Sequence, residues 1–239
     1  LYFGYDMADD YDASGDGIPD LTAFTPSTGA ISIFNGPLTI GGSDSTADTT
    51  LTVTALPTTW YNTTNSLNSI ANLGDYNHDG YEDLVVGDSG VDNGAITDVG
   101  AVYVYLGPIT ASSTPYLTIT GTATSDYVGR SADGLNADND SYDDIVVGAS
   151  HLNTTVTDGG AVALIYGPTS GSYTVSITSY PSTIAVWAGS TASGLLGAGV
   201  VGMGDFDNDR YDDFLMSASG ISNSSVVNGA LYPVYGTGQ

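Results

Sequence analysis

The 239-residue sequence predicts an all-β protein built from repeated antiparallel units of four strands. Short segments in which β-branched or other apolar residues alternate with polar ones are typical of strands, and clusters of Gly, Pro, Asn and Asp between them are typical of turns. One order of such segments recurs at intervals of about 60–70 residues, which is the size of a propeller blade or slightly more. Because no window shows a sustained apolar period of about 3.6 residues, we expect little helix.

The same four strands are expected in each unit. A short glycine-containing segment opens the unit, as in Val128-Gly129 and Leu196-Gly197, and leads into an acidic loop. An apolar strand follows, then a variable polar loop, a third strand that ends near Gly-Pro, and an alternating fourth strand. We expect second strands at residues 21–24, 84–86, 145–147 and 214–216, third strands at 30–35, 101–106, 161–166 and 230–235, and fourth strands at 51–54, 117–120 and 183–187.

The chain is expected to form one propeller segment over residues 1–239, with units at approximately 1–56, 57–122, 123–190 and 191–239. The fourth unit ends after its third strand, so its sheet should lack the outer strand. Pro233 suits that position, because proline has no N–H to donate and is tolerated at a sheet edge. We therefore predict an open arc, or part of a ring, whose unpaired edge is completed by another chain or by further sequence.

The strongest signal is an acidic loop before the second strand of every unit. Oxygen-bearing side chains stand at positions 1, 3, 5 and 9, and calcium takes six to eight oxygen ligands. They are Asp12, Ser14, Asp16 and Asp20 in loop 1; Asp75, Asn77, Asp79 and Asp83 in loop 2; Asn136, Asp138, Asp140 and Asp144 in loop 3; and Asp205, Asp207, Asp209 and Asp213 in loop 4. These loops predict up to four Ca²⁺ sites, in which the seventh residue's carbonyl fills a gap. An EF-hand is excluded, because its glutamate at position 12 is replaced by Val86 in loop 2.

These motifs resemble the FG-GAP repeats that build the β-propeller at the head of integrin α subunits. The resemblance rests on Phe3-Gly4, on the run from Gly74 to Gly80, on Val147-Gly148-Ala149 and on Tyr166-Gly167-Pro168. It implies Ca²⁺ bound within the blades, with backbone oxygens of Ile18, Tyr81, Tyr142 and Tyr211 completing the sites. Two ligand positions depart from the family pattern, at Ser14 and Asn136. Ser141 and Arg210 replace the glycine at position 6, and we expect a positive φ at both.

The charge balance limits the partners of this protein. The formal net charge is −25, from 27 acidic residues against two basic ones. Such a surface repels nucleic-acid phosphates, so no nucleic acid is expected as a partner. No run of about 18 apolar residues occurs, so no membrane insertion is expected. Loops with three carboxylates suit millimolar calcium, which indicates an extracellular or cell-surface location, and Asn62, Asn153 and Asn223 fit the N-glycosylation sequon.

Catalytic motifs are weak in this sequence, and we expect no enzyme. Gly87-Asp88-Ser89-Gly90 resembles the nucleophile sequence of chymotrypsin-like proteases, but it falls in register with the other units and so belongs to the repeat. The two histidines, His78 and His151, offer no evident triad. A two-carboxylate glycosidase is disfavoured because bound cations would keep the loop carboxylates ionised and poor as general acids.

The aromatic residues do not identify the ligand of this protein. Tyrosines on third strands (Tyr103, Tyr105, Tyr166, Tyr232 and Tyr235) are expected to pack between blades, whereas those in loops (Tyr76, Tyr81, Tyr142 and Tyr211, with Trp60 and Tyr61) could stack on sugars or on a protein. We expect an extracellular, calcium-binding adhesion module with a protein or glycan ligand at a loop rim. The alternatives are a surface-layer or filament subunit that self-assembles through the open blade edge, and a carbohydrate-binding propeller.

Overall fold

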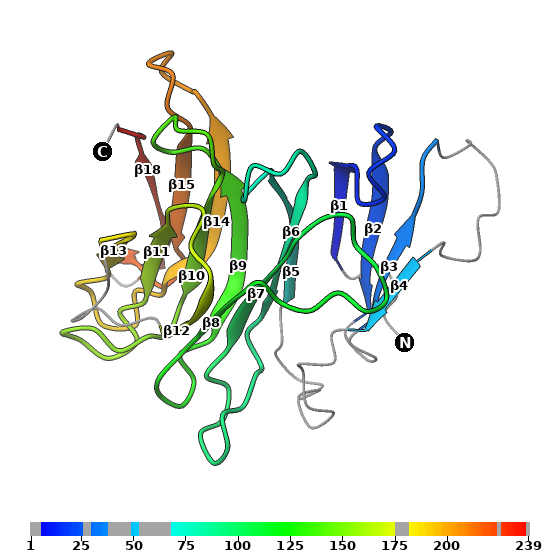
Figure 1. The fold of residues 1–239 in the computed structure, drawn as a ribbon. Coiled ribbons are helices and arrows are strands. Elements are labelled where there is room, and N and C mark those ends of the chain that lie inside the picture. Colours follow the sequence, from blue (N-terminus) through cyan, green and yellow to red (C-terminus); the bar gives the residue numbers. More distant parts are fainter. Residues whose placement is uncertain are drawn as a thin grey trace.

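A computed structural model describes residues 6–25, 30–37, 49–52, 68–174, 182–223 and 226–237. Within these segments the regular elements are strands, 18 in number, and they form several separate sheets (Figure 1). Among the same residues there is no helix with the length and apolar character needed to cross a bilayer. The expected all-β class is confirmed.

Four main sheets follow one another along the chain, and their strands pair antiparallel in sequence order. Sheet 1 contains β1 (Asp6–Tyr11), β2 (Asp20–Thr25), β3 (Ala30–Phe34) and β4 (Thr49–Thr52). Sheet 2 contains β5 (Asn68–Gly74), β6 (Asp83–Asp88), β7 (Ala101–Tyr105) and β8 (Leu117–Thr120). Sheet 3 contains β9 (Val128–Leu135), β10 (Asp144–Ala149), β11 (Ala161–Ile165) and β13 (Ile184–Ala188), and sheet 4 contains β14 (Leu196–Gly204), β15 (Asp213–Ala218) and β18 (Ala230–Val234).

The second, third and fourth strands lie where the sequence predicts them, within one or two residues; positions 53 and 54 of the first fourth strand fall outside the described residues. Sheet 4 has three strands among the described residues, and Pro233 lies in its edge strand β18, opposite Leu215 of β15. Sheets 1 and 4 lie on opposite sides of the molecule (Figure 1). This arrangement agrees with the expected open arc.

Three strands were not predicted. β12 (Gly171–Thr174) joins sheet 2 by running parallel to β8, with Gly171 opposite Leu117. The short strands β16 (Ser222–Asn223) and β17 (Val226–Val227) pair with each other. β12 was missed because its partner belongs to the preceding unit, and nothing local in a glycine- and serine-rich segment indicates that pairing. Its effect is to cover the outer edge of β8, which would otherwise offer unpaired backbone groups.

The core lies between neighbouring sheets. β6, β7, β10 and β11 are buried along their whole length, as expected for apolar strands covered on both faces. Tyr103 and Tyr105 are buried in this core, which confirms their expected packing role. Tyr232 and Tyr235, at the outer side of sheet 4, are exposed.

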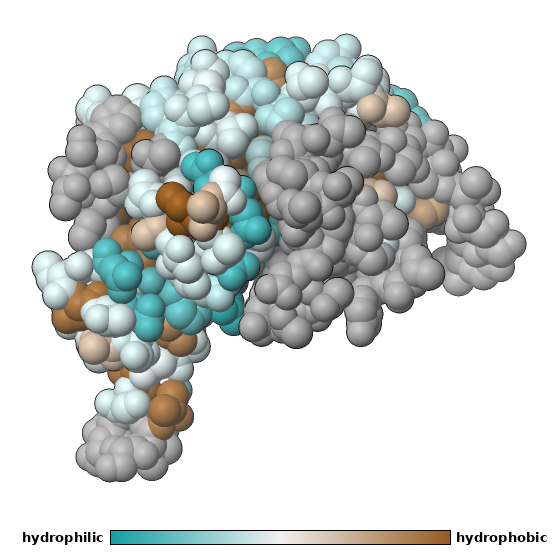
Figure 2. Space-filling model, turned by 90° about the horizontal axis from the view of Figure 1, so that it is seen from below, coloured by the Kyte–Doolittle hydropathy of each residue, from teal (hydrophilic) through white to brown (hydrophobic). Residues whose placement is uncertain are grey.

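Glycines allow the sheets to approach one another closely. Gly129 has φ = 80°, and a Cβ at this position would overlap the carbonyl oxygen of Ala101 in β7. A Cβ on Gly87 would in turn overlap the carbonyl oxygen of Gly129. Gly129, which opens one unit, therefore faces Gly87 near the end of β6 of the preceding unit, and this close contact gives a physical reason for both sequence motifs. Figure 2 views the end of the molecule near these contacts, where hydrophobic residues appear as small separate spots among hydrophilic ones.

Candidate metal centre

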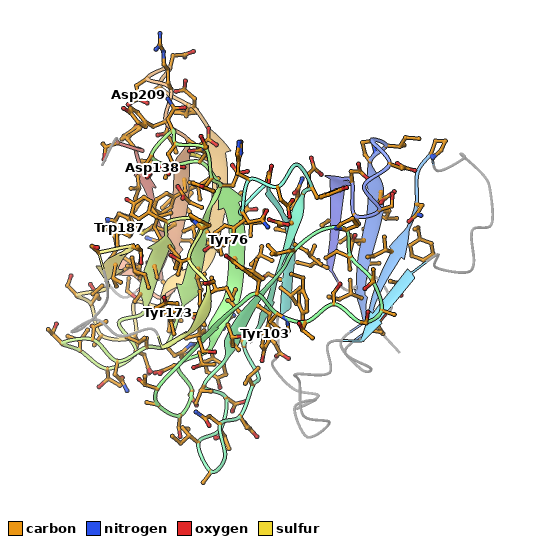
Figure 3. The ribbon with its side chains drawn as sticks, viewed as in Figure 1. Tyr76, Tyr103, Asp138, Tyr173, Trp187 and Asp209 are labelled. Atoms are coloured by element: carbon orange, nitrogen blue, oxygen red, sulfur yellow. The ribbon has the colours of Figure 1, made fainter. Side chains whose placement is uncertain are left out.

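The four acidic loops lie at one end of the molecule. Each joins the first strand of a sheet to the second: β1 to β2, β5 to β6, β9 to β10, and β14 to β15. Figure 1 shows these connections along the upper rim, and Figure 3 shows Asp138 of loop 3 and Asp209 of loop 4 there. The repeated sheet geometry therefore brings four similar loops to one rim, from positions far apart in the sequence.

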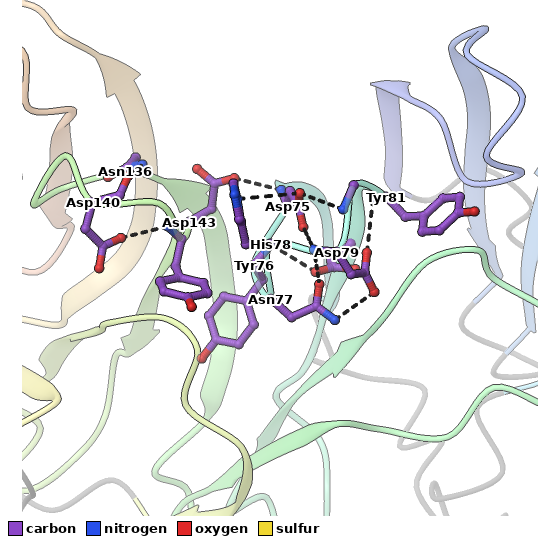
Figure 4. Close-up of polar contacts among 12 residues, drawn as sticks. Asp75, Tyr76, Asn77, His78, Asp79, Tyr81, Asn136, Asp140 and Asp143 are labelled. Carbon is purple, nitrogen blue, oxygen red and sulfur yellow. Dashed lines mark hydrogen bonds and ion pairs between the residues drawn. The ribbon is translucent and has the colours of Figure 1, made fainter.

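The first residue of loops 1, 2 and 4 holds the backbone of its own loop. In loop 2, the Oδ1 and Oδ2 atoms of Asp75 accept hydrogen bonds from the N–H groups of Asp79 and Gly80, both at 2.9 Å (Figure 4). Asp205 accepts from Asp209 and Arg210 in the same way, at 2.9 and 3.0 Å. Asp12 accepts from Gly15, Asp16 and Gly17. A carboxylate at position 1 thus fixes the turn of its own loop, because it accepts backbone N–H groups from residues later in that loop.

Loop 3 is built differently. Asn136 donates its side-chain N–H to the carbonyl oxygen of Asp140, at 3.1 Å, and accepts no bond from positions 5 and 6. Arg210 adopts the expected positive φ of 83°, but Ser141 does not, so that expectation is wrong for Ser141. In loop 3 the amide oxygen of Asn136 accepts no backbone N–H and the amide nitrogen donates to Asp140 instead, so the sixth residue is not held in the glycine-like turn that Asp75 holds in loop 2.

The fifth residue plays one role in all four loops. Its Oδ1 atom accepts a hydrogen bond from the N–H of residue 7: Asp16 from Ile18 at 2.9 Å, Asp79 from Tyr81 at 3.0 Å, Asp140 from Tyr142 at 2.7 Å, and Asp209 from Tyr211 at 3.0 Å. This bond involves the N–H of residue 7 and not its carbonyl oxygen. The carbonyl oxygen is the group of residue 7 that the family resemblance assigns to the cation.

The ninth residue has a structural role that the sequence did not reveal. Its carboxylate is buried in every loop, and it connects the loop to the glycine that follows the third strand. One oxygen accepts an N–H from the same loop: Ser14 to Asp20, Tyr76 to Asp83, Ala137 to Asp144, and Phe206 to Asp213. The other accepts from Gly36, Gly107, Gly167 and Gly236, respectively. Each carboxylate oxygen keeps a further lone pair that could face a cation.

The loops concentrate negative charge. Burial raises the pKa of Asp83 to about 7, and the carboxylates of Asp79 and Asp75 act in the same direction, against hydrogen bonds from Gly107 and Tyr76. Burial likewise raises the pKa of Asp144 to about 7. A divalent cation at these loops would favour the ionised forms and relieve the repulsion between neighbouring carboxylates.

The residues fit a hard cation. Carboxylate oxygens of Asp205, Asp207 and Asp209 lie within 4.8 Å of one another. In loop 3 the Oδ1 atom of Asn136 is buried and has no hydrogen-bond partner in the described structure, as an oxygen reserved for a ligand would be. The donors are oxygens throughout, which suits Ca²⁺ or Mg²⁺ better than a transition metal.

The aromatic side chains correct part of the sequence analysis. The sequence allows Tyr76 to stack on sugars, but the structure shows that it is fully buried. Its hydroxyl donates to the carbonyl oxygen of Thr169 and accepts from the N–H of Thr169, at 2.9 and 3.0 Å. Tyr81 is exposed, as a platform would need to be. Trp60 and Tyr61 lie outside the described residues.

A serine–histidine contact occurs away from the loops. The Oγ atom of Ser150 lies 3.0 Å from Nδ1 of His151. Ser150 is completely buried, and so is Ser89 at the matching position of sheet 2. A substrate could not reach either hydroxyl, so this contact supports a packing role.

Sequence reasoning missed a pocket between sheets 3 and 4. It has a volume of about 420 Å³ and is lined by Trp187, Met216, Ile221 and Tyr232 together with several glycines. Trp187 packs edge-on against Phe214, with 5.3 Å between ring centroids. No sequence signal could have located it, because its walls come from strands and loops of two units.

Comparisons with known proteins agree with this architecture. The FG-GAP repeat family matches residues 67–105, which include loop 2 and strands β5 to β7. The chain is 31% identical to integrin alpha-5 of Xenopus laevis over 162 residues, which cover 65% of this chain and 15% of that protein. It is 29% identical to the phosphatidylinositol-glycan-specific phospholipase D of Dictyostelium discoideum over 186 residues, which cover 69% of this chain and 20% of that protein.

The chain therefore spans at most about a fifth of the length of these relatives. The family match falls on the loop and strands whose geometry is described above, and the similarity to integrin alpha-5 extends it over most of the chain. Residues 67–105 therefore match an FG-GAP repeat, and the chain is integrin-alpha-like in sequence.

Proposed function

We propose that this protein is an extracellular, calcium-stabilised binding module that acts in adhesion through a protein ligand and carries out no catalysis. The observation that carries the proposal is the alignment of four loops at one rim, each with oxygen donors at the same positions and with its fifth residue bonded to its seventh. A repeated geometry of this kind supports one repeated ligand, and the oxygen donors favour Ca²⁺.

Calcium would be held by side chains at positions 1, 3, 5 and 9 and by the carbonyl of residue 7. These residues are Asp12, Ser14, Asp16, Ile18 and Asp20; Asp75, Asn77, Asp79, Tyr81 and Asp83; Asn136, Asp138, Asp140, Tyr142 and Asp144; and Asp205, Asp207, Asp209, Tyr211 and Asp213. The ion supplies positive charge to the loop. The carboxylate of the ninth residue accepts hydrogen bonds from the loop and from the glycine after the third strand. It would therefore couple the position of the loop to the end of that strand.

Similarity to integrin alpha-5 supports a protein ligand and a location at the cell surface or outside the cell. The activity in the name of the phospholipase D belongs to that protein, of which this chain matches 20%. The exposed side chain of Asn153 is compatible with glycosylation, whereas Asn62 lies outside the described residues.

The test is an array of purified extracellular-matrix proteins and glycans, probed with the chain in millimolar Ca²⁺ and again in EDTA. We expect binding to protein spots that disappears in EDTA and returns when calcium is restored. Binding to glycans alone would instead establish the carbohydrate-binding alternative. Absence of binding to any spot in calcium would contradict the binding module.

A second candidate, a self-assembling surface-layer or filament subunit, is favoured by the outer side of β18. Within the described residues no strand pairs with that side, and Leu231 and Tyr232 are exposed on β18. Unpaired strand edges invite pairing with another chain. Light scattering of the chain with and without calcium tests this role, with Leu231→Lys as the matched variant. Growth of particles in calcium that Leu231→Lys abolishes would support assembly, and a constant monomer would refute it.

A further inference from the structure

The dipeptide Asn-Gly occurs three times in the chain, and the fold treats the three copies differently. They are Asn35-Gly36, Asn93-Gly94 and Asn228-Gly229. An asparagine loses its side-chain amide when the backbone nitrogen of the next residue attacks its Cγ atom. Glycine permits that approach because it has no Cβ. The attack also needs a backbone nitrogen that is free of a hydrogen bond and has open space around it, so the structure can distinguish the three copies.

Two of the three glycine nitrogens are held by hydrogen bonds. The N–H of Gly36 donates to Oδ1 of Asp20 at 2.7 Å, and a Cβ on Gly36 would overlap the carbonyl oxygen of Pro19. The N–H of Gly229 donates to the carbonyl oxygen of Ile221 at 3.0 Å. Each bond must break before its nitrogen can attack the preceding asparagine, and the bond of Gly36 to a carboxylate is the stronger kind.

Gly94 has neither restraint. Asn93 and Gly94 are both exposed, and within the described residues the N–H of Gly94 donates no hydrogen bond. A Cβ placed on Gly94 would meet no atom within 4 Å, so the space around this nitrogen is open. The side chain of Asn93 also has no hydrogen-bond partner in the part of the chain that the structure describes. Both reacting groups are therefore accessible at this copy.

The two residues belong to a hairpin between β6 and β7. The N–H of Asn93 donates to the carbonyl oxygen of Ile96 at 2.8 Å, and the N–H of Ile96 donates to the carbonyl oxygen of Asn93 at 3.1 Å. Gly94 has φ = 63°, as turns of this length require at their first central residue. Neither bond involves the N–H of Gly94. The hairpin lies at the rim opposite the acidic loops, because β6 leads to it from loop 2 (Figure 1).

We propose that Asn93 is a site of spontaneous deamidation, and that the fold directs this modification to Asn93 and away from Asn35 and Asn228. The backbone nitrogen of Gly94 gives its proton to water and forms a bond to Cγ of Asn93. The bond from Cγ to the amide nitrogen breaks, and ammonia leaves. Water then opens the resulting five-membered imide, at one carbonyl to give aspartate and at the other to give isoaspartate. The net change consumes one water and releases one ammonia, and it needs no oxidant or reductant.

The modification changes both the charge and the backbone of the hairpin. Each event takes the formal net charge of the chain from −25 to −26. The isoaspartate form carries one additional carbon in the main chain, within a turn that is closed by two hydrogen bonds. The carbonyl oxygens of Thr97 and Asp98, directly after the hairpin, accept the N–H groups of Ser125 and Tyr127 at 3.0 and 3.2 Å. The modified turn therefore adjoins a contact between units 2 and 3. The reaction does not depend on calcium, so this proposal and the proposed function can fail separately.

The site is tested first in the unaltered chain, aged in a mildly alkaline buffer that contains CaCl₂. Samples taken over time are digested with chymotrypsin, and mass spectrometry follows the gain of about 1 Da in the peptide that contains each asparagine. The gain at Asn93 is expected to be about tenfold faster than at Asn228, because one backbone hydrogen bond must break there first, and slower still at Asn35. A gain at Asn93 that is no faster than at Asn228 would overturn the proposal.

The same measurement on the chain unfolded in urea separates the effect of the fold from that of the local sequence. Each of the three asparagines precedes glycine, so the three rates are expected to converge once the hydrogen bonds of Gly36 and Gly229 are lost. If the rates in urea kept the order and the ratios measured in the folded chain, the local sequence alone would set the selectivity, and that result would also overturn the proposal.

Two variants test the assigned atoms. Gly94→Ala should slow the gain of mass at Asn93 several-fold, because the added methyl group obstructs the attacking nitrogen, whereas the matched control Gly229→Ala should leave the rate at Asn93 unchanged. Asn93→Gln keeps Gly94 in the turn but would have to form a larger ring, so it should remove the gain of mass at residue 93. An unchanged rate at residue 93 in both Gly94→Ala and Asn93→Gln would contradict attack by the nitrogen of Gly94.

Discussion

Loops 3 and 4 occupy equivalent places in the fold but are held by different bonds. Asp205 accepts two backbone N–H groups of its own loop, and three carboxylates of loop 4 lie within 4.8 Å. Asn136 instead donates to Asp140, and its Oδ1 atom is buried without a partner. Loop 4 therefore has its turn held by its own first carboxylate and concentrates repulsive charge, whereas loop 3 has less charge and keeps an unsatisfied oxygen. The change from carboxylate to amide at the first position alters both the hydrogen bonds of the loop and its charge.

The largest effect should follow from removing calcium. An ion that binds only the folded state stabilises it by RT ln(1 + [L]/Kd), about 2.7 kcal/mol for each site at a hundredfold excess over Kd. Thermal unfolding in millimolar CaCl₂ should therefore occur at a higher midpoint than in EDTA, and MgCl₂ at the same concentration should restore less. Hydrogen exchange should show that loop 3 loses more protection than loop 4 in EDTA. Equal midpoints of thermal unfolding in CaCl₂ and in EDTA would contradict the assignment of Ca²⁺ to the acidic loops.

A pH series needs a reference carboxylate outside the loops, and Asp88 provides one. It is buried at the end of β6, and desolvation raises its pKa to about 6, against a hydrogen bond from Gly90. Since the folded-state pKa lies above the unfolded value, the stabilising contribution is complete below about pH 4 and is lost as the pH rises through about 6. The loss amounts to about 2–3 kcal/mol at most.

Asp88→Asn cannot ionise, so its free energy of unfolding should fall less between pH 4.5 and 7.5 than that of the unaltered chain. Urea unfolding at both pH values measures the difference, and Asp158→Asn, at a partly exposed site, is the matched control. Parallel pH profiles for Asp88→Asn and the unaltered chain would show that Asp88 does not titrate as its burial implies.

The charge difference between the two loops should appear in calcium affinity. Loop 4 carries a carboxylate at positions 1, 3, 5 and 9, and loop 3 has an amide at position 1. More ligand charge generally gives tighter calcium binding, although Arg210 offsets part of it. Asp209→Ala should weaken the tightest binding step about tenfold, or about 1.4 kcal/mol, while Asp140→Ala affects a weaker step. Calorimetric titration that shows the opposite order would contradict the ranking.

The smallest expected effect tests whether the amide of Asn136 alone causes the difference in calcium affinity between loops 3 and 4. Asn136→Asp should allow the first residue of loop 3 to accept N–H groups as Asp75 does, and should tighten its calcium step by a few-fold. Asp75→Asn in loop 2 is the reciprocal control and should weaken binding. If calorimetry shows no change for Asn136→Asp, the amide does not cause the difference in calcium affinity between loops 3 and 4.

The sequence by itself located the second, third and fourth strands of the units and the positions of the acidic loops. A strand with one covered face alternates apolar and polar residues, and this pattern can be read within the strand itself. The alternation at residues 117–120 therefore predicts the strand that the structure shows as β8 (Leu117–Thr120), without knowledge of its neighbours. The spacing of oxygen-bearing residues in the loops is local as well. It identified the carboxylates of Asp16 and Asp79, which the structure places in equivalent turns.

Only the tertiary structure decided what those residues contact across units. Tyr76 looks like an exposed loop residue in the sequence, but Thr169 of the next unit encloses it. Asp143 looks like one more acidic residue, but it binds the N–H of Asp75, 68 residues earlier. Such contacts depend on how neighbouring sheets are positioned by the close approach of Gly87 and Gly129, and no pattern within one unit records that distance.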